Sequence, residues 1–98
     1  MLIRCYHISR QKNRTSILKN GLIPSGKTEG RIKYKPRIFL STSINHLGYD
    51  YVDFENVDCW EFEVEEELLK RDEFSGNEFH FYIEEKVGPG ELRLLANL

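Results

Sequence analysis

The chain is poor in cysteine and contains no long hydrophobic run. Cys5 and Cys59 are too few and too far apart for a disulfide framework or for a zinc site of paired cysteines. We therefore expect two buried free thiols and no metal. The absence of any run of about 18 apolar residues argues against a membrane-spanning helix and a membrane partner. At the N-terminus, Arg4, His7 and Arg10 interrupt any signal-peptide pattern, which predicts a cytoplasmic location.

What remains is the composition of a folded domain. Hydrophobic residues make up 40% of the chain and charged residues 31%, a balance too apolar for a disordered protein. A length of 98 residues is enough for one hydrophobic core and too short for two. We expect residues 1–98 to form a single domain with one functional site.

The charges are unevenly distributed along the sequence. Residues 1–37 hold ten Lys or Arg against one acid, a charge of +9, whereas residues 38–98 hold four against fifteen acids, a charge of −11. The basic half could hold a phosphate-bearing ligand, and the acidic half would repel nucleic acid bound non-specifically. Alternatively, the two halves interleave in space and their charges largely neutralise each other.

Short segments of strand-like alternation surround few helical ones. The pattern predicts strands at residues 2–9, 37–43, 59–65, 78–87 and 91–95, and short helices at 13–20 and 43–51. In the segment 59–65, Trp60, Phe62 and Val64 face one side and three glutamates face the other. Several short strands in mixed order with few helices indicate an α+β domain built on antiparallel sheet.

Four polar features are candidates for chemistry. In the strand at 78–87, Glu78, His80 and Tyr82 share one face, which is either a solvated surface or the wall of a cleft. His7 is either a structural histidine or a functional one. The hydroxyls of residues 41–43, beginning with Ser41, either bind a ligand or cap the next helix. A nucleophilic pair of Cys5 and His7 is disfavoured, because the sequence offers no third group to orient it.

Three motifs, taken in order, resemble the ADP-ribosyltransferase superfamily, in the His-Tyr-Glu branch that includes the poly-ADP-ribose polymerases and the diphtheria-type toxins. "YHIS" followed by "ILKNGL" is similar to the opening strand and helix of that family. "RIFLSTSINHLGYDY" is similar to the strand and short helix that carry its two aromatic residues. "NEF" at residues 77–79 is similar to the motif that carries its catalytic glutamate. The resemblance covers nearly the whole chain and implies a small ADP-ribosyltransferase-like fold, with split antiparallel β-sheets and short helices.

The resemblance also implies roles for individual residues toward NAD, the co-substrate. His7 would hydrogen-bond the adenosine ribose, and Glu78 would bind the nicotinamide ribose and stabilise the positive charge that develops there. Phe39 would stack on the nicotinamide ring, with Tyr49 or Tyr51 as the second aromatic wall.

Further candidate contacts lie beside these residues. The NAD-binding set is completed by Ile8, Ser9 and Ser41, with Ile8 at the position where the family usually has glycine. From charge alone, we infer that the basic side chains at positions 31, 33, 35 and 37 contact pyrophosphate or the target.

The implied activity is NAD-dependent mono-ADP-ribosylation of a protein or nucleic acid, with release of nicotinamide, as in a toxin or a phage or bacterial defence protein with an inhibitor or antitoxin partner. "YHIS" also resembles the toxins that modify thymidine in DNA, and the fold is shared with the RNA 2'-phosphotransferases. Ile8 in place of glycine and Phe39 in place of tyrosine favour one alternative, a non-catalytic module that binds NAD, ADP-ribose or a partner. An RNA 2'-phosphotransferase is the other alternative.

Overall fold

The structure is a computed structural model that describes residues 1–24, 28–29, 32–33, 36–47 and 56–95. The described residues form an α+β domain with one α-helix and a six-stranded antiparallel sheet in the order β6-β7-β4-β1-β5-β8. The strands of this sheet are β1 (Leu2–Arg10), β4 (Ile38–Ser41), β5 (Val57–Glu65), β6 (Lys70–Arg71), β7 (His80–Ile83) and β8 (Arg93–Leu95). The predicted fold class, α+β on antiparallel sheet, is confirmed at this level.

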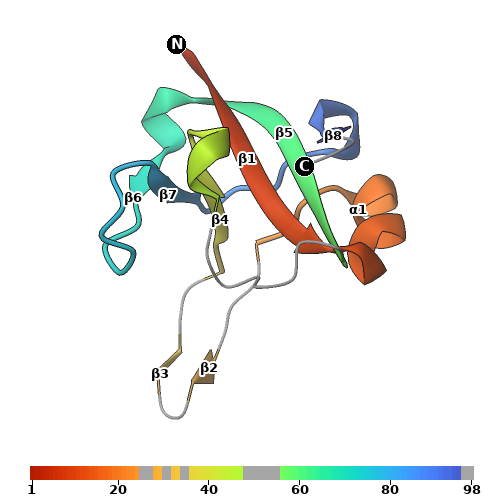
Figure 1. Cartoon of the computed structure of the whole chain (residues 1–98), viewed down its shortest axis with the longest axis horizontal. Coiled ribbons are helices and arrows are strands. Elements are labelled where there is room, and N and C mark those ends of the chain that lie inside the picture. Colours follow the sequence, from red (N-terminus) through yellow and green to blue (C-terminus); the bar gives the residue numbers. More distant parts are fainter. Residues whose placement is uncertain (25–27, 30–31, 34–35, 48–55, 96–98) are drawn as a thin grey trace.

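The main strands lie in one continuous sheet, whereas the resemblance implied split antiparallel sheets. Only β2 (Thr28–Glu29) and β3 (Ile32–Lys33) stand outside it among the described strands, pairing with each other away from the rest (Figure 1). At the centre of the sheet, β1 pairs with β5 over nine registered positions, from Leu2 opposite Glu65 to Arg10 opposite Val57. This long ladder fixes the register of the central strands.

The hydrophobic core lies on one face of the sheet. Trp60, Phe62 and Val64 of β5 are buried there as the alternation predicted, together with Cys5 of β1. The cluster is completed by Ile17, Leu22, Ile38, Leu40, Ile83 and Val87. Within the described residues no helix is long and apolar enough to cross a membrane.

Helix α1 (Arg14–Asn20) begins and ends close to the predicted residues. Its C-terminal cap is Gly21, with a φ of 79°, whose amide donates to the carbonyl of Ile17 at 2.8 Å. This left-handed conformation is the reason that glycine is needed there. Leu22 then forms an isolated bridge with Val87, which fastens the end of the helix to the C-terminal part of the chain.

A buried ion pair joins the first turn of α1 to the sheet. Two nitrogens of Arg14 donate to the two carboxylate oxygens of Asp58 on β5, at 3.0 and 2.6 Å. Asp58 is only 4% exposed, whereas the Arg14 side chain is half-exposed. The hydrogen bonds and charge of Asp58 raise the pKa of Arg14 above its ordinary value. Removing either partner would leave the other without its counter-charge, and the cost is larger for the buried carboxylate.

Gly21 provides a sharp test of this packing. A Cβ at Gly21 would lie 2.1 Å from the carbonyl oxygen of Val87, whereas a Cβ at Gly76, where φ is 68°, would meet nothing within 4 Å. We expect Gly76→Ala to lower the free energy of unfolding by about 1–2 kcal/mol, from the backbone conformation alone. Gly21→Ala should exceed that loss by at least about 1 kcal/mol, because the backbone of Val87 must also move. Urea denaturation measures both, and equal losses would contradict the close approach.

Candidate active site

His7 lies on the central strand β1 and reaches across to β4. Its Nδ1 lies 2.5 Å from the carbonyl oxygen of Phe39. Since a carbonyl can only accept, Nδ1 carries the proton, and in the neutral ring Nε2 is left as an acceptor. Burial lowers the pKa of His7 below its ordinary value of 6.5, and the hydrogen bond to Phe39 opposes this only in part. The ring is therefore neutral at pH 7, with a nitrogen able to accept a hydrogen bond from a hydroxyl.

The contact with Phe39 places His7 in the seam between β1 and β4. These strands share one registered pair, Tyr6 opposite Ser41, within their described lengths. Beside this pair, Nδ1 of His7 and the carbonyl of Phe39 add a side-chain link between the two strands. The side chain of His7 shares the core face of the sheet with Trp60, which stands opposite it on β5, whereas the ring of Phe39 lies on the other face.

Phe39 presents its ring on the face of β4 opposite the core. It is 44% exposed, whereas its neighbours Ile38 and Leu40 are buried. The ring lies 6.1 Å from that of Tyr82 on β7, tilted by 60°. The guanidinium carbon of Arg37 stands 4.1 Å from the centre of the Tyr82 ring. Together, Phe39, Tyr82 and Arg37 form an aromatic patch that carries a positive charge.

One nitrogen of Arg37 has unused hydrogen-bonding capacity. The Nε atom is buried and lacks a hydrogen-bond partner among the described residues. Arg37 is the member of the predicted basic set whose side chain lies within the described residues; positions 31 and 35, and the side chain at position 33, lie outside them. A buried donor without a partner is unfavourable, so an acceptor beside Arg37 would be bound favourably.

Three of the predicted NAD-binding residues are buried. Ile8 is almost fully covered, and the hydroxyl of Ser9 accepts from Nε1 of Trp60 at 2.9 Å. The hydroxyl of Ser41 donates to the carbonyl of Ser43 at 2.8 Å and accepts from its amide at 3.1 Å. Both hydroxyls therefore hold internal structure. Ser43 caps the 3₁₀ turn at Ile44–His46, which matches the capping alternative for this run of hydroxyls.

Glu78 lies in an exposed turn before β7 rather than on the strand. The side chain of Asn77 accepts from the amide of Phe79 at 2.9 Å, and Arg71 donates to the Glu78 carbonyl at 2.8 Å. The strand that follows this turn pairs with β4, and β4 pairs with β1. Two strand spacings therefore separate the turn from β1, roughly 10 Å across the sheet.

The two candidates for the second aromatic wall, Tyr49 and Tyr51, lie outside the described residues.

Cys5 is an inert core thiol. It is fully buried, its Sγ lies 3.4 Å from the carbonyl oxygen of Ile3, and burial raises its pKa to about 12. Burial also raises the pKa of Cys59 to about 11, with a smaller contribution from Glu61. Both are free thiols, as predicted. A buried thiol that stays protonated is a poor nucleophile, which argues against a nucleophilic Cys5–His7 pair.

A histidine cluster near Glu78 escaped the sequence analysis. His80 contacts the hydroxyl of Ser75 through Nδ1 and the carbonyl of His46 through Nε2, the latter at 2.8 Å. The ring of His46 stacks on Phe79 at 4.3 Å. The sequence had shown His80 only as one member of a polar strand face. Its contact with Ser75, five residues earlier, depends on how the β6–β7 turn closes, for which the sequence gives no separate signal.

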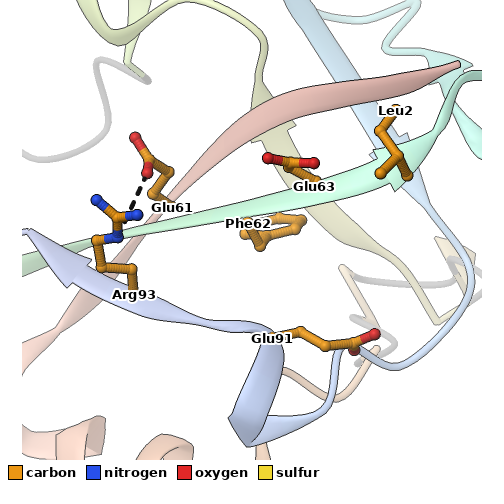
Figure 2. A pocket seen from close by; sticks show the side chains of 6 residues that line it. All are labelled: Leu2, Glu61, Phe62, Glu63, Glu91 and Arg93. Carbon is orange, nitrogen blue, oxygen red and sulfur yellow. Dashed lines mark ion pairs between the residues drawn. The ribbon is translucent and has the colours of Figure 1, made fainter.

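A surface hollow of about 310 Å³ lies elsewhere, beside β5 and β8. Figure 2 shows its lining: Leu2, Glu61, Phe62, Glu63, Glu91 and Arg93. Glu61 pairs with Arg93 at 3.7 Å, and Glu91 accepts from the amide of Gly88 at 2.8 Å. Three carboxylates against one guanidinium disfavour an anionic pyrophosphate. The predicted site residues do not line this hollow, and among the described residues no cluster of His, Cys, Asp or Glu is arranged to hold a metal.

The lowered pKa of His7 predicts a pH-dependent stability. The unfolded chain binds the proton more readily than the folded one, so stability is complete above about pH 6.5 and falls as the pH drops through the folded-state pKa. One such group contributes a slope of at most about 1.4 kcal/mol per pH unit. We expect His7→Gln to reduce the slope of unfolding free energy between pH 7 and pH 5, measured by urea denaturation. Identical slopes in the two proteins would rule out a lowered pKa at His7.

Comparison with known proteins gives no family assignment. No family model, no curated protein and no solved structure matches this chain.

Proposed function

We propose that the chain is an NAD-dependent mono-ADP-ribosyltransferase that transfers ADP-ribose to a macromolecule and releases nicotinamide. The observation that carries the proposal is strand order. The strands that bear His7 and Phe39, and the strand that follows the Glu78 turn, are consecutive neighbours β1, β4 and β7. Residues separated by about 70 positions in the chain thus belong to one continuous half of the sheet.

His7 is suited to the ribose role by its protonation state. A neutral ring with Nδ1 committed to the Phe39 carbonyl offers Nε2 as an acceptor for a ribose hydroxyl. The main-chain contact also fixes the orientation of the ring, so a bound hydroxyl would meet a preorganised partner.

In this proposal, NAD reaches from β1 to the turn that precedes β7. His7 would bind the adenosine ribose, and Glu78 would bind the nicotinamide ribose at the other end of the pyrophosphate. A carboxylate there stabilises the positive charge that builds on the sugar as the bond to nicotinamide breaks. On the face of the sheet opposite to His7, the exposed ring of Phe39, tilted against Tyr82, offers a stacking surface for the flat cationic nicotinamide.

Two observations favour a second candidate, a binding module of the same fold without turnover. Ile8 is buried at a position where the resemblance expects a glycine, and Glu78 lies in a turn open to solvent. The pyrophosphate contact suggested by Arg37 serves binding in either case, so NAD affinity alone does not separate the two candidates. The release of nicotinamide separates them, because a binding module would not release it.

The catalytic role of the Glu78 carboxylate can be tested with Glu73, a nearby glutamate, as the control. We expect Glu78→Gln to reduce the rate of nicotinamide release from NAD by at least about 100-fold, because the amide cannot stabilise the developing cation. Glu73 is also exposed and lies in the preceding turn, so Glu73→Gln should leave the rate unchanged. Release is measured by chromatography, with NAD binding followed by calorimetry. Equal rates in wild type and Glu78→Gln would disprove the catalytic role, and binding without release in wild type would favour the module.

Two substitutions of Phe39 test its role in stacking on NAD. We expect Phe39→Leu to weaken NAD binding by about 2- to 13-fold, which corresponds to the ~0.5–1.5 kcal/mol of an aromatic pair. Phe39→Tyr keeps the ring and should bind NAD as tightly as wild type. Calorimetric titration measures both variants. An affinity that is the same in Phe39→Leu as in Phe39→Tyr would show that the ring does not contact NAD.

A further inference from the structure

We propose that Ser75 is a base-activated nucleophile, with His80 as its general base and the main-chain carbonyl of His46 as the group that orients the base, and that it accepts acyl groups from activated esters. This inference does not depend on NAD. It rests on a chain of three hydrogen-bonded groups that begins at an exposed hydroxyl.

The direction of proton transfer follows from the acceptor at the far end. The carbonyl of His46 can only accept, so Nε2 of His80, 2.8 Å away, carries a proton. In the neutral ring Nδ1 is then unprotonated, and it is this nitrogen that contacts the hydroxyl of Ser75. Ser75 therefore donates to His80. A hydroxyl that donates to a histidine held by a third group is the arrangement of an activated serine.

The orienting carbonyl is held on two sides. Nδ1 of His46 lies 2.9 Å from the hydroxyl of Ser43, and the ring of His46 stacks on Phe79. The amide of Thr42 donates to the carbonyl of Phe79 at 2.9 Å. These contacts join the 3₁₀ turn at Ile44–His46 to the segment that carries His80, so the carbonyl of His46 is held in place beside the His80 ring.

The nucleophile itself is accessible and partly stabilised. Ser75 is exposed, and its oxygen accepts from the amide of Asn77 at 3.3 Å, which favours negative charge developing on that oxygen. The guanidinium of Arg71 is bound to the carbonyl of Glu78, in the turn that follows the one with Ser75, and brings a positive charge to this loop.

The acyl transfer needs only the serine, the histidine and the ester. The oxygen of Ser75 attacks the carbonyl carbon of the ester, and its proton moves to Nδ1 of His80. The new oxygen–carbon bond forms, the bond to the leaving alcohol breaks, and the alcohol leaves with the proton or as its anion, the proton then passing to solvent. The product is an acyl-serine ester, and no oxidant or reductant is needed.

Acetylation by p-nitrophenyl acetate tests the proposal in the 98-residue chain. Nitrophenolate release is followed by absorbance, and acetylated positions are identified by peptide mass mapping. Ser16 of α1 is an exposed serine in the same molecule and serves as the internal reference. We expect Ser75 to be acetylated at least about 100-fold faster than Ser16, the factor that a positioned general base supplies. Equal acetylation rates at Ser75 and Ser16 in the wild-type protein would by themselves overturn the proposal.

Two variants separate activation from a purely structural role. His80→Gln keeps a donor for the His46 carbonyl but has no base at the Nδ1 position, and should lose the rate advantage of Ser75. Ser16→Ala removes an exposed hydroxyl on α1, outside this cluster, and should leave acetylation at Ser75 within about twofold of wild type. Circular dichroism checks that both variants are folded. Undiminished acetylation of Ser75 in folded His80→Gln would exclude the histidine as the base.

Discussion

The ladder between β1 and β5 is the constraint on which the rest of the structure depends. Its nine registered pairs include His7 opposite Trp60 and Ser9 opposite Asp58. A slip of one residue would move every side chain of β1 to the other face of the sheet. The hydrogen bond from the Trp60 indole to the Ser9 hydroxyl works against such a slip, because it satisfies two buried polar groups only in the observed register. The position of His7 beside β4 is therefore a consequence of how β1 sits on β5.

The same ladder explains how the two charged halves of the sequence are combined. β1 belongs to the basic half, and it lies between β4 and β5, both from the acidic half. Arg4 stands opposite Glu63, and Arg14 binds the buried Asp58. The interleaving alternative thus holds for these pairs. Arg37 differs, because it stacks on an aromatic ring and keeps a buried nitrogen without a partner among the described residues. Its surroundings suit an added anion.

Most helices and strands could be predicted from the sequence because the patterns that indicate them involve residues close together in the chain. Alternation in 59–65, the helix at 13–20 and the glycine after it depend on neighbours a few residues away. The start of β7 was predicted two residues too early. The alternation of Glu78 to Ile83 suggested an unbroken strand, but Asn77 closes a turn through its side chain and the strand begins only at His80. The continuous sheet and the closure of the β6–β7 turn depend on contacts between distant segments, which a local pattern does not encode.

The role of a histidine in the site depends on the residue type and also on the backbone group that its ring meets. Histidine in "YHIS" was ambiguous because its role depends on what the imidazole meets, and the carbonyl of Phe39 comes from a strand 32 residues away. That carbonyl selects the tautomer and leaves Nε2 as an acceptor. The carbonyl of His46 does the opposite to His80, fixing the proton on Nε2 and leaving Nδ1 free to accept. Two histidines in one small sheet are thus held in different tautomers by main-chain acceptors, so the first is suited to binding a hydroxyl and the second to removing a proton from one.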